Sequence, residues 1–197
     1  GSIRRWLAAL PASAGSPAGV LQALWKLPDD GAGDLCNTVA RAGLACLREQ
    51  GNLNLLEAFD RPAVVNLQLS GYSVQVVVET LSADGVTLAA GPGYTHRFPV
   101  SAFAALWYGR MWLLWRPPHG VSVMRPGMTG AAVSWLRHAL GLPVRGADST
   151  YDKQLEAAVR AFQRRHALVP DGIAGPETLM VLRRSLGDVS GPRLRDG

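Results

Sequence analysis

The sequence predicts an α+β domain followed by an all-α domain of three helices. Hydrophobic residues first recur at helical spacing, then alternate as in strands, and finally return to helical spacing. Between the alternating part and the last helical part lies Arg116–Gly127, a stretch with three prolines and two glycines. Because proline fixes φ and removes a backbone donor, we expect neither a helix nor a central strand through it. The expected ranges are 3–118 for the first domain, 119–190 for the second and 191–197 for a tail.

Three short helices are expected before any strand. Ser16-Pro17 opens the first, over Ala18–Trp25, Asp34 caps the second, and Asn52–Phe59 forms the third. A later helix is expected from Ser101 to Trp107. The β-rich runs are Ala63–Leu69, Ser73–Val78, Gly85–Ala89, His96–Val100 and Met111–Arg116. Helices followed by a small antiparallel sheet indicate the α+β class, with Trp107, Trp112 and Trp115 in the core.

The second domain is expected to consist of three helices. They cover Thr129–Leu140, Lys153–His166 and Pro176–Leu186, each with apolar residues recurring on one face.

Charge and composition narrow the class of protein. Nearly half of the residues are apolar and the net charge is +5, with most of the basic excess after Pro118. A basic surface suits an anionic polymer. No apolar run approaches the roughly 20 residues that cross a bilayer. Gly1-Ser2 is typical of a cleavage scar, so we expect a piece of a longer protein.

The two cysteines, Cys36 and Cys46, are ten residues apart. On one continuous helix their Cα atoms would be about 15 Å apart, beyond the roughly 7 Å of disulfide reach. A chain reversal at Ala42-Gly43 would bring them together. The residues alone leave a disulfide and two free thiols both open.

The second domain resembles the type-1 peptidoglycan-binding domain. The resemblance rests on Gly127-Met-Thr-Gly130, Tyr151-Asp152, Ala158–Gln163 and Asp171–Thr178, in the family's order over about sixty residues. It implies non-covalent binding of peptidoglycan. One departure is Arg137, where the family often has glutamine.

Six residues of this motif are candidates for peptidoglycan binding. We expect Gly172 and Gly175 to permit positive φ in a tight loop, and Asp171 and Thr178 to organise that loop and the helix after it. The other two share a helix with the core residue Phe162 but lie largely off its buried stripe, so we expect them to be exposed and able to bind acetamido, hydroxyl or carboxylate groups. These two are Arg160 and Gln163.

The sequence indicates no metal site and no cofactor. His138 and His166 have no third ligand at a suitable spacing, and a catalytic zinc ion needs about three protein ligands.

The first domain resembles the papain-like domain of bacteriocin-processing cysteine peptidases. Cys36 stands near a helix start, and a Val-rich strand and a Gly91-Pro92 turn follow. In the active enzymes that strand begins with a catalytic histidine and an aspartate precedes the proline, and both are missing here. A thiolate needs a positioned base, so the resemblance implies an inactive pseudo-peptidase. The alternative is a cell-wall or secretion-linked cysteine hydrolase that uses Cys36 with His96 as its base.

Taken together, the two domains resemble the periplasmic region of general secretion pathway protein A. In that family a cytoplasmic ATPase domain and one transmembrane helix precede this region, which implies the periplasmic, soluble part of an inner-membrane protein. A periplasmic location fits a Cys36–Cys46 disulfide. The resemblance also implies a multimeric scaffold of type II secretion that binds peptidoglycan and, with general secretion pathway protein B, places the outer-membrane secretin. A nucleic-acid partner would rest on the basic charge alone, and we expect none.

Overall fold

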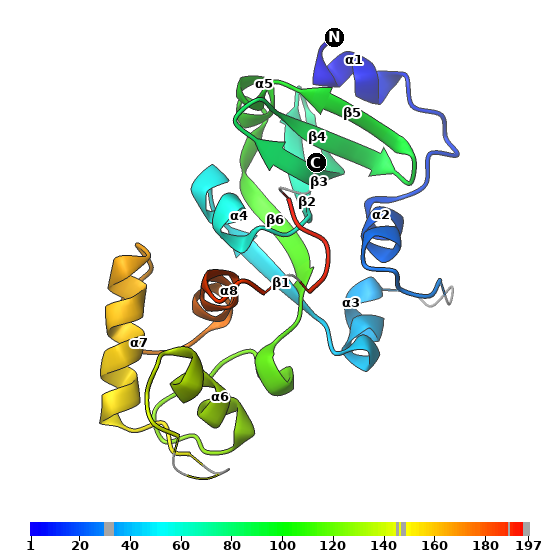
Figure 1. Cartoon of the computed structure of the whole chain (residues 1–197). Coiled ribbons are helices and arrows are strands. Elements are labelled where there is room, and N and C mark those ends of the chain that lie inside the picture. Colours follow the sequence, from blue (N-terminus) through cyan, green and yellow to red (C-terminus); the bar gives the residue numbers. More distant parts are fainter. Residues whose placement is uncertain (30–33, 145, 147–148, 189, 195–197) are drawn as a thin grey trace. The chain divides into compact units, whose positions relative to one another are not determined.

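The computed structural model describes residues 1–29, 34–144, 146, 149–188 and 190–194. Contacts between Cα atoms divide the chain into two compact units (Figure 1). Unit 1 comprises Gly1–Ala42, Cys46–Trp115 and Val189–Gly197, and unit 2 comprises Gly43–Ala45 and Arg116–Asp188. The domain ranges expected from the sequence remain an expectation about independent folding, and residues 195–197 of the expected tail lie outside the described residues.

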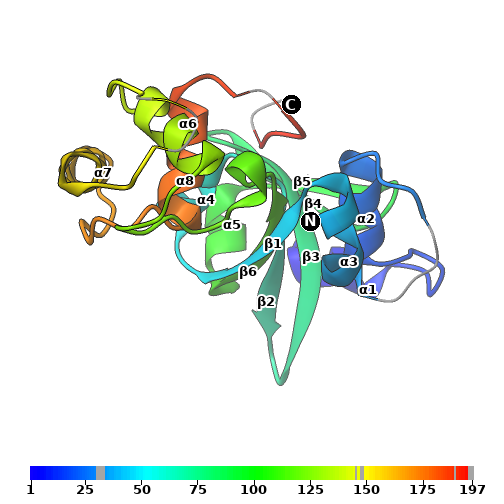
Figure 2. The same cartoon turned by 90° about the horizontal axis from the view of Figure 1, so that it is seen from below.

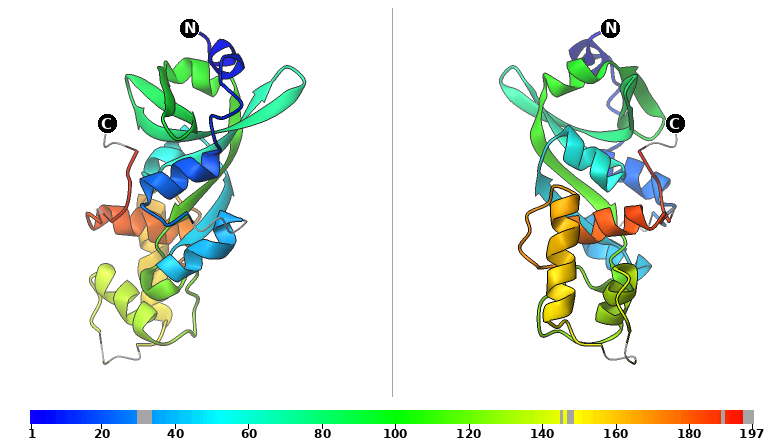
Figure 3. Two further views of the ribbon diagram at one scale, coloured as in Figure 1. Left: turned by 90° about the vertical axis from the view of Figure 1, so that its right-hand side faces the viewer. Right: turned by 60° about the vertical axis from the view of Figure 1, so that its left-hand side comes forward.

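Unit 1 is built around a six-stranded sheet with strand order β1-β6-β2-β3-β4-β5. Strands β2 to β5 and β6 pair with their neighbours in antiparallel register, for example Asn66 with Gln75 and Val64 with Trp112. The hairpin of β2 and β3 extends beyond the rest of the sheet (Figure 3). The strands are β1 (Ala45–Gln50), β2 (Ala63–Leu69), β3 (Tyr72–Ser82), β4 (Gly85–Gly91), β5 (Tyr94–Phe98) and β6 (Trp107–Trp115).

Helices lie on both faces of this sheet (Figure 2). On one face are α4 (Leu53–Phe59) and α5 (Val100–Ala104), and on the other are α2 (Pro17–Leu24) and α3 (Leu35–Thr38), which continues as a 3₁₀ turn over Val39–Ala42. The expected caps are present, since Ser16 Oγ accepts from the Gly19 N–H and Asp34 Oδ1 accepts from the Cys36 N–H. The expected α+β class is confirmed.

Two elements of unit 1 were not expected from the sequence. Helix α1 (Ile3–Ala8) buries only Ile3, and the edge strand β1 buries only Leu47. Strand β1 lacks the alternating repeat of a half-buried strand. Helix α1 does have Ile3, Trp6 and Leu7 at helical spacing after a Ser2 cap, a signal that the sequence prediction missed. The prediction for Trp112 was also wrong in part, because Trp107 and Trp115 are buried whereas Trp112 is only half-buried.

Unit 2 contains the three expected helices. They are α6 (Ala131–Ala139), α7 (Lys153–Arg165) and α8 (Pro176–Ser185), and a short 3₁₀ turn, Pro118–Gly120, precedes them. The loop before α6 is held by isolated antiparallel bridges, from Met124 to Ala174 and from Thr129 to Thr150. The core is formed by Val133, Leu136, Tyr151, Leu155, Val159, Phe162, Leu179 and Leu182. Among the described residues, no helix has the length and apolar character needed to cross a membrane.

The chain returns to unit 1 after α8. Arg61 donates to the carbonyls of Ser190 and Pro192, and the Leu81 N–H donates to the carbonyl of Leu194, which is buried. The segment 190–194 is therefore a strap on unit 1, where the sequence suggested a tail.

An ion pair fixes this strap. Arg193 lies 2.7 Å from Oδ2 of Asp60, a carboxylate with only 2% of its side chain exposed. Gly191 has φ of +84°, and a Cβ atom there would lie 2.5 Å from the ring of Trp25, so only glycine fits.

We predict that Arg193→Ala lowers the free energy of unfolding by about 3 kcal/mol, because it leaves the Asp60 carboxylate buried without its cation. Urea unfolding of the whole chain measures this. The control is Arg97→Ala, which removes an exposed hydrogen bond to Ser82. A change in Arg193→Ala no larger than in the control would show that the strap contributes nothing to stability.

Candidate functional site

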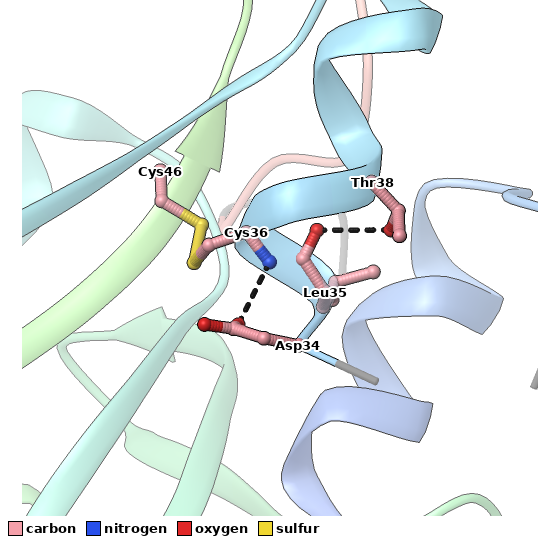
Figure 4. Close-up of a disulfide and its surroundings, with 5 residues drawn as sticks. All are labelled: Asp34, Leu35, Cys36, Thr38 and Cys46. Carbon is pink, nitrogen blue, oxygen red and sulfur yellow. Dashed lines mark hydrogen bonds between the residues drawn. A yellow bond between two sulfur atoms is a disulfide. The ribbon is translucent and has the colours of Figure 1, made fainter. Parts of the chain in front are cut away.

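The sulfur atoms of Cys36 and Cys46 form a disulfide, with a Cα–Cα distance of 5.5 Å (Figure 4). Cys36 lies in the first turn of α3, capped by Asp34, and Cys46 lies on β1. The chain reverses between them through the 3₁₀ turn and Gly43, at φ of +72°. The disulfide expected from the family resemblance is therefore present in the structure.

The structure does not provide the nucleophile and base that the hydrolase alternative requires. With Cys36 Sγ bonded to Cys46 Sγ, no thiolate is present at that position. The proposed base, His96, is exposed on the edge strand β5 and packs against Trp6 and Phe98. Helix α3 and strand β5 lie far apart within unit 1 (Figure 1). Cys36 and His96 therefore do not form a catalytic pair.

No metal site is apparent in the part of the chain that the structure describes. Within it, no three His, Cys, Asp or Glu side chains are grouped so that they could hold an ion.

In unit 2 the sequence-predicted residues meet at the side-chain amide of Gln163. Its Nε2 lies 2.9 Å from Asp171 Oδ1, 2.9 Å from the Ile173 carbonyl and 3.1 Å from Thr178 Oγ1. Its Oε1 accepts from the Gly172 N–H at 3.0 Å. The side-chain amide of Gln163, on α7, thus links the loop 171–173 to the start of α8.

The expectation that Gln163 is exposed is wrong. Only 1% of the residue is exposed, because its amide is turned into the loop and every polar atom of the amide has a protein partner. Thr178 is also buried, and Asp171 Oδ1 additionally accepts from the Ile173 N–H. These three side chains build the loop, and the contacts they already make explain why the motif requires them.

The two glycines of the loop differ. Gly172 has φ of +77°, as expected, and a Cβ atom there would lie 2.9 Å from Arg160 Nε and from Glu156 Cγ. Gly175 does not have positive φ; at φ of −83° and ψ of −176° it is extended backbone and forms the N-cap of α8. The expectation of a left-handed conformation at Gly175 is therefore wrong.

Tyr151 also supports the loop 171–173. Its hydroxyl donates to the Gly172 carbonyl at 2.6 Å, and the residue is only 1% exposed. Burial, with the nearby Glu156 carboxylate, raises the pKa of Tyr151 well above its usual value, so the hydroxyl keeps its proton as a donor. The backbone of Tyr151 also holds the loop before α6. The Gly127 N–H donates to the Tyr151 carbonyl, and the Tyr151 N–H donates to the Met128 carbonyl.

Arg137, the departure from the family pattern, has an internal role. It is buried and donates to the Pro143 carbonyl, to Asp152 Oδ1 at 3.0 Å and to Gln154 Oε1. The Leu155 N–H, followed by the Arg137 guanidinium, lowers the pKa of the Asp152 carboxyl, which caps α7.

Among the sequence-predicted polar side chains, those of Arg160 and Asp171 reach solvent. The Arg160 side chain is 40% exposed, while its guanidinium donates to Glu156 and to the Pro170 carbonyl. Lys153, Ala157 and Arg164 lie at helical spacing from it and are exposed. We call these four residues the α7 stripe. Sequence reasoning missed Lys153 and Arg164, although their spacing of seven and four residues from Arg160 was the available signal.

Comparison with known proteins bears on both units. Residues 129–182 match the family described as "Putative peptidoglycan binding domain". Over 82% of its length the chain is 31% identical to "General secretion pathway protein A" of Aeromonas hydrophila. Over 86% it is 27% identical to "Putative general secretion pathway protein A" of Escherichia coli strain K12. The chain spans 30% and 35% of the lengths of these two relatives.

A solved structure covers almost the whole chain. It is the crystal structure of a periplasmic domain of the EpsAB fusion protein of the Vibrio vulnificus type II secretion system, with 26% identity and a TM-score of 0.54. The match spans 95% of this chain and 96% of that one, so it includes both units in the same order. The chain is a homologue of general secretion pathway protein A. The resemblance expected from the sequence is thereby confirmed.

We predict that Gln163→Ala lowers the free energy of unfolding of this chain by about 3 kcal/mol, since it removes the partner of the buried Gly172 N–H and of the buried Thr178 hydroxyl. Amide hydrogen exchange of residues 171–175 should rise in parallel. Arg165→Ala, an exposed change on the same helix, is the control. Unchanged exchange in the loop would contradict the role of the Gln163 amide.

Proposed function

We propose that this chain holds peptidoglycan non-covalently in the periplasm, as part of a type II secretion system. The match of residues 129–182 to the peptidoglycan-binding family is the observation that carries the proposal. The likeness of the whole chain to a periplasmic domain of a type II secretion protein supports the location and the system. The disulfide agrees with an oxidising compartment.

The role we propose is structural and non-catalytic. The position where the peptidase resemblance expects a nucleophile is occupied by half of a disulfide. By anchoring the complex to the cell wall, the chain would serve as a scaffold on which general secretion pathway protein B and the outer-membrane secretin are positioned. The scaffold role, and multimerisation of the longer protein, are proposed from the relationship to general secretion pathway protein A.

We further propose that the α7 stripe is the surface that contacts the wall. Gly172, Gly175, Thr178 and Gln163 were candidates for this contact, but their polar groups are used within the loop or their backbone shapes it. Asp171 was also a candidate; it is exposed, and its Oδ1 is used within the loop. Arg160 keeps its place as a candidate because it is exposed beside Lys153 and Arg164. Ammonium and guanidinium groups suit the carboxylates of stem peptides, and the small Ala157 between them leaves room for a ligand.

Co-sedimentation with purified, protein-free sacculi tests this proposal. We predict that the unmodified chain pellets and that Lys153→Gln with Arg164→Gln reduces the bound fraction several-fold. Arg160 is left unchanged because it also supports the loop. Binding should weaken with added salt, since the screening length falls from about 10 Å at 0.1 M to about 3 Å at 1 M.

The matched control removes two exposed arginines from unit 1, Arg5→Gln with Arg41→Gln. Truncation after Pro118 is a poorer control because it also deletes the strap of residues 190–194 from unit 1. If the chain does not pellet, wall binding is wrong for this chain. If it pellets and both double variants behave alike, the wall is bound by another surface.

A further inference from the structure

A hollow of about 480 Å³ opens on the sheet of unit 1. Its walls come from four adjacent strands, β1, β6, β2 and β3. Asn66 and Gln75 face each other in register, as do Val64 and Trp112. Because side chains two residues apart share a face of a strand, Arg110, Trp112, Asn66 and Gln75 point to the same side.

Two unpaired cations line this hollow. Arg48 on β1 and Arg110 on β6 are exposed, and within the described residues neither guanidinium has a hydrogen bond or an ion pair. Glu49 is the one carboxylate among the lining side chains. Since each guanidinium offers a planar fork of donors that matches a carboxylate, two such groups on neighbouring strands favour an anionic ligand.

The rest of the lining suits a peptide. Gln75 Nε2 donates to Asn66 Oδ1 at 3.4 Å, which leaves the Asn66 Nδ2 donor and the Gln75 Oε1 acceptor to pair with a peptide main chain. Gln50 donates to the Tyr108 carbonyl and still has a free acceptor. The half-buried indole of Trp112 offers a flat apolar surface for a side chain. The volume lies within the roughly 300–1,000 Å³ typical of small-ligand sites, enough for a few residues of an extended chain.

We propose that this hollow binds an acidic segment of a partner protein. Arg48 and Arg110 hold a carboxylate of that segment, Asn66 and Gln75 meet its main chain, and Trp112 packs against an apolar side chain. A protein is favoured over the cell wall because wall contact is proposed for the α7 stripe of unit 2. The choice of a protein over the wall rests on that proposed function, whereas the binding of an acidic ligand by the hollow uses residues of unit 1 only.

Fluorescence anisotropy with a defined probe tests the proposal. The probe is a capped, fluorescein-labelled hexapeptide of alternating glutamate and leucine, and its counterpart has glutamine in place of glutamate. We expect the glutamate peptide to bind the whole chain at least about tenfold more tightly, as one charge-assisted interaction implies. Arg48→Gln with Arg110→Gln should weaken its binding by about tenfold or more.

The control is again Arg5→Gln with Arg41→Gln, which removes the same charge elsewhere on unit 1 and should leave the affinity within about twofold. Both lining arginines are exposed, so urea unfolding and pelleting with sacculi should be unchanged in the Arg48/Arg110 variant.

Three results would overturn the proposal. The first is no binding of the glutamate peptide, and the second is equal binding by the Arg48/Arg110 variant and the parent chain. The third uses unlabelled, uncrosslinked disaccharide-peptides released from sacculi as competitors. If they displace the probe at lower concentration than the unlabelled hexapeptide does, the hollow belongs to the wall and not to a protein. Weaker displacement supports the protein partner.

Discussion

The amide of Gln163 is the interaction on which the architecture of unit 2 depends. It joins α7 to the 171–173 loop and to the start of α8, while Tyr151 braces the same loop through the Gly172 carbonyl. A buried amide is stable only if its donors and acceptors are paired, so Asp171 and Thr178 supply the side-chain acceptors that Gln163 needs. These motif residues determine the shape of the loop, which is why we propose the exposed side of α7 for recognition.

In unit 1 the cysteine at the position of a peptidase nucleophile is bonded to a second cysteine. The disulfide converts the position of a nucleophile into a covalent link between α3 and β1. A cross-link of this kind stabilises a fold mainly by restricting the unfolded chain. The strap of residues 190–194 adds a second long-range link, through the Asp60–Arg193 ion pair. The disulfide and the ion pair both stabilise the fold of unit 1, in agreement with the non-catalytic role we propose.

Much of this organisation was predictable from the sequence, and the misses have physical causes. The helices of unit 2 and strands β2 to β6 have strong periodicity, and helices α2 and α3 of unit 1 begin at clear caps, Ser16 and Asp34. Strand β1 buries one residue and has no alternating pattern, so it carries no such signal. Helix α1 has a Ser2 cap and apolar residues at helical spacing, and the sequence prediction overlooked both. Gln163 is buried because the loop that begins at Asp171, eight residues later in the sequence, folds back against α7. Helical spacing does not reveal this contact. The strap depends on a contact between residues 133 positions apart, which no local pattern encodes.

The claim that recognition lies on the exposed side of α7 is tested most directly by NMR. The ¹⁵N-labelled chain would be titrated with uncrosslinked disaccharide-peptides released from sacculi, and amide shifts would be mapped onto the structure. Shifts concentrated at Lys153, Ala157, Arg160 and Arg164, with the Gln163 side-chain amide unperturbed, are the predicted result. Shifts concentrated at Asp171, Gly172 and the Gln163 side chain would contradict it, because the loop would then be the binding site and not its support.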